Sequence, residues 1–170
     1  AHEVTRLGMA RPFQVVKPFS GLSVLDNVVV GALARHHRVD EATALAREVI
    51  KKVGLEHVAH QMAGSLPIGL RKKLELARAL ATQPAFLLLD EVMGGLTPPE
   101  IAEMMDLIRR LNAEGITILA IEHILHAIMR LSHRIVVLHH GERIAEGPPQ
   151  EVARDPAVIE AYLGEEFLLA

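Results

Sequence analysis

Two short apolar runs, each ending in charged residues, dominate the hydrophobic pattern of the chain. Phe86–Leu89 is followed directly by Asp90 and Glu91, and Ile116–Ile121 is followed by a glutamate and His123. A continuous apolar run is typical of a strand in a parallel sheet. The first run therefore predicts a buried parallel strand, and the β-branched residues of the second run predict another strand.

The segment between these runs carries the signals of an amphipathic helix. Thr97 is a typical N-cap, Pro98 fits the first helical position, Glu100 completes a capping box, and Gly115 fits the end. Apolar residues recur at helical spacing: Ile101, Met104, Met105, Ile108 and Leu111. A strand, a helix and a strand in this order predict a βαβ unit with parallel strands, and thus an α/β fold.

Two further helices are predicted before the first run. Ser23 is a possible N-cap for a helix through about Leu33, although Val28–Val30 leave a strand as the alternative. Asp40 opens a more clearly periodic helix that ends at Gly54. The apolar spacing of this second helix is the stronger signal of the two.

The remaining predicted elements are short. Residues 1–19 are expected to form an irregular loop, and residues 124–131 a helix. Residues 134–138 are predicted to be a strand that turns back into residues 143–146. Two short helices are expected in the tail after residue 148. We find no internal repeat and no low-complexity segment.

The composition excludes several classes of function. The 170 residues are sufficient for one compact domain, and half of them are apolar, which argues against disorder. The 18 basic and 21 acidic residues create no field that attracts nucleic acid or anionic lipid. The chain has no cysteine and no apolar run of the ~20 residues that span a bilayer. Any association with a membrane is therefore expected to need a partner protein.

The acidic pair after the first run is the strongest chemical feature. Open α/β sheets place their chemistry beyond the carboxyl ends of the strands. There, Asp90 and Glu91 suit a Mg²⁺–nucleotide site, because one carboxylate can hold the metal while the other orients a water molecule. An acidic strand end at the protein surface is the alternative. In a βαβ unit, His123 would reach the same edge of the sheet.

Five short motifs occur along the chain in a fixed order. They are Gln14 after an Arg-Pro-Phe sequence, Leu66–Arg71 before a helix, Phe86–Glu91, Gly94–Thr97, and His123 after an isoleucine and a glutamate. In this order they resemble the glutamine loop, signature segment, Walker B strand, D-loop and histidine switch of the ATP-binding subunits of ABC transporters. The resemblance covers nearly the whole chain, and the ordered set is far more specific than any single motif.

Within this family the chain is most similar to the branched-chain amino-acid importers. This narrower similarity rests on Ala10–Gln14, Glu91–Pro98 and Val158–Gly164. It implies ATP and Mg²⁺ as cofactors, and membrane-spanning permease subunits and a second ATPase subunit as partners. It also implies a cytoplasmic protein held peripherally at the inner face of the cell membrane. Neither a nucleic-acid partner nor direct insertion into the membrane is expected.

The family resemblance implies a role for each residue at the edge of the sheet. Asp90 would hold Mg²⁺, and Gln14 would reach both the metal and the attacking water. Glu91 would polarise that water, and His123 would contact the γ-phosphate. These assignments agree with the preference of Mg²⁺ for carboxylate and water oxygens.

The signature segment departs from the family's usual Leu-Ser-Gly-Gly-Gln. Pro67 stands at the serine position, Ile68 at the first glycine position and Leu70 at the glutamine position. Pro67 provides neither a hydroxyl nor an N–H group. In the family this segment contacts ATP held by the partner subunit, and the corresponding residues here are Leu66, Pro67, Ile68, Gly69 and Arg71.

No segment matches the phosphate-binding pattern G-x-x-x-x-G-K-[ST]. The nearest string, Gly64–Gly69, is followed by Leu70 and Arg71 instead of Lys and Ser or Thr. In the family this Walker A loop lies upstream of the glutamine loop, so we expect a truncated chain that is inactive alone. Loss of the strand before that loop would also leave apolar strand edges, which predicts self-association, domain swapping or a markedly opened sheet.

The resemblance divides the chain into four segments. Residues 1–19 would carry the glutamine loop, 20–82 a helical subdomain with the signature helix, 83–147 a partial P-loop NTPase core, and 148–170 a helical tail. A non-catalytic interaction module, binding permease subunits or a complete ATPase partner, is the alternative function. The absence of the phosphate-binding pattern favours it, whereas the intact acidic pair argues against it.

Overall fold

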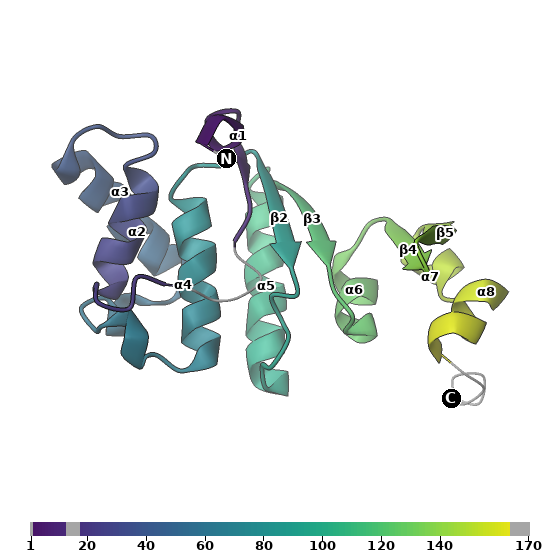
Figure 1. Ribbon diagram of the computed structural model, residues 1–170. Coiled ribbons are helices and arrows are strands. Elements are labelled where there is room, and N and C mark those ends of the chain that lie inside the picture. The colour runs from purple at the N-terminus through teal and green to yellow at the C-terminus, as the bar shows by residue number, and fades with distance from the viewer. Residues whose placement is uncertain (1, 13–17, 164–170) are drawn as a thin grey trace. The chain divides into compact units, whose positions relative to one another are not determined.

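The computed structural model describes residues 2–12 and 18–163 (Figure 1). The chain forms two compact units, which divide between Glu122 and His123. The segment boundaries predicted at residues 82 and 147 were drawn from sequence motifs, and they stay predictions. Each unit is described here by itself.

A three-stranded parallel sheet runs through the first unit. Its strands are β1 (Met9–Ala10), β2 (Phe86–Asp90) and β3 (Thr117–Ile121), in this order across the sheet. β2 and β3 pair along their whole length, so that the last residue of β2 lies opposite the last residue of β3. The predicted parallel pairing of the two apolar runs is confirmed, and their carboxyl ends share one edge of the sheet.

Helix α5 (Pro98–Ala113) connects β2 to β3 and begins as the sequence predicts. Thr97 is its N-cap within a capping box, and the Thr97 N–H donates to Glu100 Oε2 over 2.8 Å. After the helix, Gly115 takes a φ of 97°, which suits a glycine. One stripe of the helix is buried: Ile101, Met104, Met105, Leu107, Ile108 and Leu111.

Three further long helices belong to the first unit (Figure 1). They are α2 (Val24–Ala32), α3 (Val39–Val53) and α4 (Ile68–Leu80). Ser23 caps α2 by accepting from the N–H group three residues on, which decides between helix and strand in favour of the helix. Gly54 ends α3 in the left-handed region with a φ of 75°, as predicted.

A buried amide anchors the chain that leads into α2. Asn27 is fully buried, and its Oδ1 accepts from the Phe19 N–H over 2.9 Å. Its Nδ2 donates to the carbonyls of Phe19 at 3.0 Å and Ser23 at 2.8 Å. Two 3₁₀ turns, η1 (Glu56–Val58) and η2 (Ala63–Ser65), lead from α3 towards α4.

The predicted irregular loop is wrong for residues 2–10. This stretch forms α1 (His2–Arg6) and β1, whose Met9 lies opposite Phe86 of β2. The Gly8 carbonyl accepts from the Phe86 N–H over 3.0 Å. A strand of two residues has no alternation that a sequence can reveal, and only its pairing with β2 makes it a strand.

The two central strands are covered unequally. β2 buries Leu87 and Leu89, as predicted, whereas on β3 Leu119 is 50% exposed and Ile121 is 60% exposed. Successive side chains of a strand point to opposite faces of the sheet. Leu119 and Ile121 are two positions apart, so they lie on the same face of β3, and this face is apolar and exposed. In the described part of the first unit, β3 is also an edge strand.

The second unit is an antiparallel hairpin with short helices. Its hairpin follows the prediction, and the turn places His140 and Gly141 at φ values of 48° and 85°, typical of a type I′ turn. Ile135, Val152 and Val158 form its small core. The elements are α6 (Leu125–Leu131), β4 (Ile135–His139), β5 (Glu142–Gly147), α7 (Pro149–Val152), α8 (Pro156–Val158) and the π-helical turn η3 (Ile159–Leu163).

None of the helices in the described ranges is both long and apolar enough to traverse a bilayer.

The exposed face of β3 predicts self-association of the purified chain. The double substitution Leu119→Lys/Ile121→Lys places two charges on this face and is expected to lower the average mass in light scattering across a concentration series. The control Val39→Lys changes a side chain that is 65% exposed on α3, and we expect no effect on the mass. A wild-type chain that stays monomeric throughout would contradict the prediction.

Candidate functional site

The turn that follows β2 presents the two predicted carboxylates, and we call residues 90–94 the acidic turn. Glu91 takes a φ of 49°, in the left-handed region, which costs a non-glycine residue about 1 kcal/mol. Its N–H donates to the Ile121 carbonyl of β3 over 2.9 Å, and its own carbonyl accepts from the Gly94 N–H at 3.3 Å. The direction in which the turn leaves the sheet is therefore fixed by the neighbouring strand.

Arg11 holds the carboxylate of Asp90. Arg11 Nη2 lies 2.8 Å from Asp90 Oδ2, and the Asp90 side chain is only 14% exposed. Because Arg11 directly follows β1, this ion pair joins the carboxyl ends of two adjacent strands. The sequence analysis used Arg11 only for the family resemblance and missed this contact, although its position three residues before Gln14 was a usable signal.

Glu122 is a second residue that the sequence reasoning left without a role. Its Oε1 accepts from the N–H of Met93 over 2.8 Å, and the Met93 side chain is fully buried. Glu122 follows the last residue of β3, so it supports the acidic turn from the neighbouring strand. Its position at the end of the second apolar run was the available signal.

Helix α4 contacts the same turn through Lys72. Lys72 Nζ donates to the main-chain carbonyl of Glu91 over 2.9 Å. Burial lowers the pKa of Lys72, and the nearby carboxylates of Glu122 and Glu91 oppose this shift. The acidic turn is thus held by β3 on one side and by α4 on another.

The predicted signature segment is a backbone turn anchored by packing. Leu66 is 2% exposed, and Pro67 is the N-cap of α4 with no side-chain hydrogen bond. Ile68 is 46% exposed. Arg71 Nη2 donates to the Gly64 carbonyl over 2.8 Å, so this guanidinium braces its own segment. Contacts of these residues with ATP on a partner subunit stay a prediction.

Gly69 lies against the capping box of α5. A Cβ atom on residue 69 would lie 2.2 Å from Glu100 Oε1, closer than any packing allows. The Thr97 backbone N–H and hydroxyl, both bonded to Glu100, hold the pKa of that carboxyl below its ordinary range. A small cavity of about 230 Å³ adjoins this contact between α4 and α5, lined in part by Lys73 and Leu96. Gly69 therefore has a structural role independent of any ligand.

The structure does not test the positions of two predicted site residues. Gln14 lies outside the described residues. His123 is the first residue of the second unit, so its proximity to Asp90 and Glu91 stays a prediction. Among the residues that the structure describes, no three His, Cys, Asp or Glu side chains form a group that could hold a metal ion.

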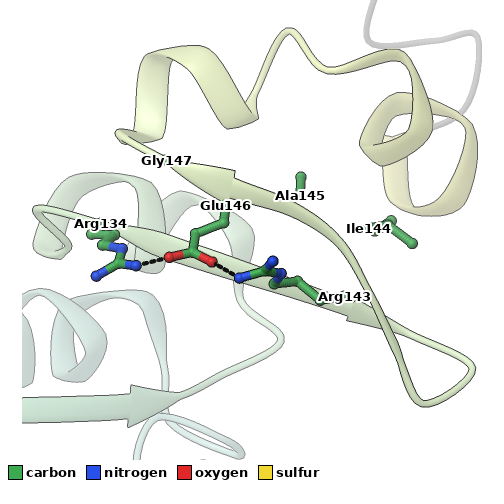
Figure 2. Close-up of a pocket in the computed structure, with 6 residues that line it drawn as sticks. All are labelled: Arg134, Arg143, Ile144, Ala145, Glu146 and Gly147. Atoms are coloured by element: carbon green, nitrogen blue, oxygen red, sulfur yellow. Dashed lines mark hydrogen bonds and ion pairs between the residues drawn. The ribbon is translucent and has the colours of Figure 1, made fainter.

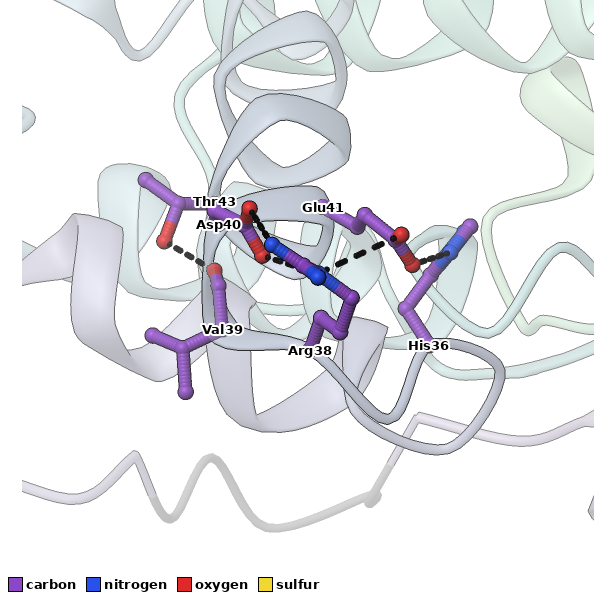
Figure 3. A network of polar contacts seen from close by, with 6 residues as sticks. All are labelled: His36, Arg38, Val39, Asp40, Glu41 and Thr43. Atoms are coloured by element: carbon purple, nitrogen blue, oxygen red, sulfur yellow. Dashed lines mark hydrogen bonds and ion pairs between the residues drawn. The ribbon is translucent and has the colours of Figure 1, made fainter.

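Two other polar clusters are explained by local structure. In the second unit Glu146 pairs with both Arg134 and Arg143 on the hairpin (Figure 2). At the start of α3 Arg38 pairs with Asp40 at 2.7 Å and lowers the pKa of that carboxyl (Figure 3). Exposed pairs of this kind contribute little to stability.

Comparison with known proteins identifies the family. The family model described as ABC transporter matches residues 2–94. The high-affinity branched-chain amino acid transport ATP-binding protein BraF of Pseudomonas aeruginosa is 35% identical, over 96% of this chain and 71% of BraF. The chain belongs to the ATP-binding subunit family of ABC transporters. A second model, described as branched-chain amino acid ATP-binding cassette transporter, matches residues 142–168.

Further relatives and solved structures agree with this family. LivG of Salmonella typhimurium, a high-affinity branched-chain amino acid transport ATP-binding protein, is 36% identical over 96% of this chain and 70% of LivG. The crystal structure of a nucleotide-free ATP-binding cassette from an ABC transporter has a TM-score of 0.83 at 28% identity. The match covers 96% of this chain and 72% of the chain in that crystal structure. The α/β fold expected from the sequence is therefore confirmed.

ABC ATPases bind ATP, generally with Mg²⁺, and the acidic turn fits such a group. Mg²⁺ is commonly held by one or two carboxylates together with substrate phosphates and water. Asp90 offers a carboxylate at the edge of the sheet, with one oxygen held by Arg11.

The contact between Gly69 and Glu100 predicts a double-mutant result. Gly69→Ala is expected to displace the Glu100 carboxylate and lower the free energy of unfolding by about 1 kcal/mol, the usual value of a helix cap. In a Glu100→Ala background the same substitution is expected to cost nothing, because the clashing atom is gone. Urea unfolding of the four variants measures both values. Equal costs in the two backgrounds would contradict this origin.

Proposed function

We propose that the chain is an ATP-binding and ATP-hydrolysing subunit of an importer for branched-chain amino acids. In this proposal it works with membrane-spanning permease subunits and a second ATPase subunit, at the cytoplasmic face of the membrane. The observation that carries the proposal is its identity of 35–36% with BraF and LivG across 96% of the chain. The acidic turn at the paired ends of β2 and β3 supplies matching chemistry.

In this proposal each residue of the acidic turn and its surroundings has a separate role in ATP hydrolysis. Asp90 would bind the Mg²⁺ that accompanies ATP, and the bound nucleotide supplies the phosphoryl group that is transferred to water. Glu91 would orient and polarise that water, since a positioned base is typically worth 10²–10⁴ in rate. Gln14 would reach towards the metal and the water, and His123 towards the γ-phosphate. The ion pair with Arg11 holds one oxygen of the Asp90 carboxylate in place at the end of β2.

The signature segment would face ATP on the second subunit with a reduced set of donors. Pro67 has no hydroxyl and no N–H, and Arg71 is engaged by the Gly64 carbonyl. The N-terminal end of α4 still offers backbone N–H groups and a favourable dipole to an anion. Trans contact in this proposal therefore rests on the backbone near Gly69.

We predict negligible ATP hydrolysis by the 170-residue chain alone. Its sequence contains no phosphate-binding pattern, and even one missing transition-state donor costs 10²–10³ in rate. Phosphate release by the purified chain is the measurement, with Glu91→Gln as the catalytic variant and Glu56→Gln as an exposed control. Robust turnover that Glu91→Gln abolishes and Glu56→Gln retains would overturn this prediction while supporting the assignment of Glu91.

The transport function is tested in an assembly. Permease subunits, a complete ATP-binding partner and this chain are reconstituted in vesicles, and ATP-driven uptake of radiolabelled leucine is measured. Uptake that Glu91→Gln in this chain lowers by roughly 10²-fold or more supports a catalytic subunit. Uptake equal with and without the chain rejects the proposal.

A non-catalytic interaction module is the second candidate, favoured by Pro67 and by the absence of the phosphate-binding pattern. In the same assembly this module would raise or lower the activity of the complete partner, and Glu91→Gln would change nothing. Association is measured by co-purification and by the partner's ATPase rate. Absence of association and of any change in rate would remove this candidate.

A further inference from the structure

One lysine of α4 contacts the main chain of the proposed catalytic glutamate. Lys72 directly follows the signature segment on α4, and its Nζ donates to the Glu91 carbonyl over 2.9 Å. The lysine is half-buried, and the carboxylates of Glu91 and Glu122 are both close enough to stabilise its charge. Lys72 is therefore linked to the acidic turn by a hydrogen bond as well as by electrostatic attraction.

The bond from Lys72 completes the fixation of Glu91. Peptide groups are planar, so fixing the groups before and after a residue fixes its φ and ψ and the direction of its Cα–Cβ bond. The Glu91 N–H is bonded to Ile121, and the Glu91 carbonyl is bonded to Lys72, with the Gly94 N–H a more distant donor at 3.3 Å. A left-handed non-glycine residue persists only where its surroundings determine it in this way.

We propose that Lys72 is a positioning residue that fixes the backbone of Glu91, and so the direction of its carboxylate, from the signature helix. The inference rests on the proposed function, in which Glu91 orients the attacking water. Because Lys72 and Gly69 both lie in the first two turns of α4, a shift of this helix would move the group that is bonded to the Glu91 carbonyl. Contact of the signature segment with its ligand would thereby adjust the carboxylate of the same chain.

The adjacent residue provides a matched control. Lys73 is also half-buried on α4, but its Nζ pairs with Glu103 of α5 at 2.7 Å, and the described residues show no hydrogen bond or ion pair from it to the acidic turn. Lys73→Met and Lys72→Met remove the same charge from neighbouring positions of one helix. Lys72→Arg keeps a cation and hydrogen-bond donors, and serves as the conservative variant.

Hydrogen exchange in the 170-residue chain tests the positioning without any catalysis. In Lys72→Met the amides of Glu91, Met93 and Gly94 are expected to exchange at least about tenfold faster, the loss expected for one charge-assisted bond. Amides within β2 should keep their rates, and Lys73→Met should leave the acidic turn unchanged. Lys72→Arg should restore slow exchange. Equal rates in the two Met variants, or acceleration throughout the chain, would overturn the proposal.

The reconstituted assembly tests the consequence for catalysis. Lys72→Met is expected to lower kcat for ATP about tenfold or more while KM for ATP changes less than about threefold, because the substrate contacts remain. Lys73→Met should leave both near the wild-type values. A loss shared by kcat and KM, or equal in the two variants, would overturn the role of Lys72. Absence of ATPase activity in the wild-type assembly would reject the proposed function instead, and hydrogen exchange would still decide the positioning.

Discussion

The parallel pairing of β2 with β3 is the interaction on which the candidate site depends. It places Asp90 opposite Ile121 and lets the Ile121 carbonyl accept the Glu91 N–H. The chain therefore leaves the sheet at a fixed point and in a left-handed conformation. A slip of one residue would turn each side chain of β2 to the other face of the sheet, and Asp90 would then no longer face Arg11. The buried residues of β2 and α5 resist this slip, so the register that the core requires is also the register that assembles the acidic turn.

The acidic turn and the signature segment are stabilised by different means. The acidic turn is tied by side chains of its surroundings, with Arg11, Lys72 and Glu122 bonded to three successive parts of it. The signature segment is held mostly by packing, through the buried Leu66 and through Gly69 against the α5 cap. This difference explains how the segment accommodates Pro67. A backbone turn fixed by packing tolerates the loss of a hydroxyl, whereas the acidic turn depends on each polar partner.

Family membership and the local structure inform different parts of the function. Identity of about a third with branched-chain amino acid transport proteins extends over 96% of this chain and about 70% of those proteins. It carries no information about how this chain holds its own carboxylates. The Arg11–Asp90 pair and the Lys72–Glu91 bond are features of the folded chain, and they show how its carboxylates are held.

The sequence by itself determined the elements whose signals are local. The capping box at Thr97, the glycine stop at Gly54 and the hairpin turn at His140 depend on neighbouring residues, and each was predicted correctly. β1 and the contacts of Lys72 and Glu122 were decided only by the tertiary structure. β1 is a strand only because Met9 pairs with Phe86 of β2, which lies 77 positions later in the sequence. In the sequence, nothing distinguishes Lys72 from other lysines near a helix start. Only the fold brings it beside the Glu91 carbonyl. Such bonds between distant segments leave no periodicity in the chain, because their geometry is set by the sheet and not by spacing.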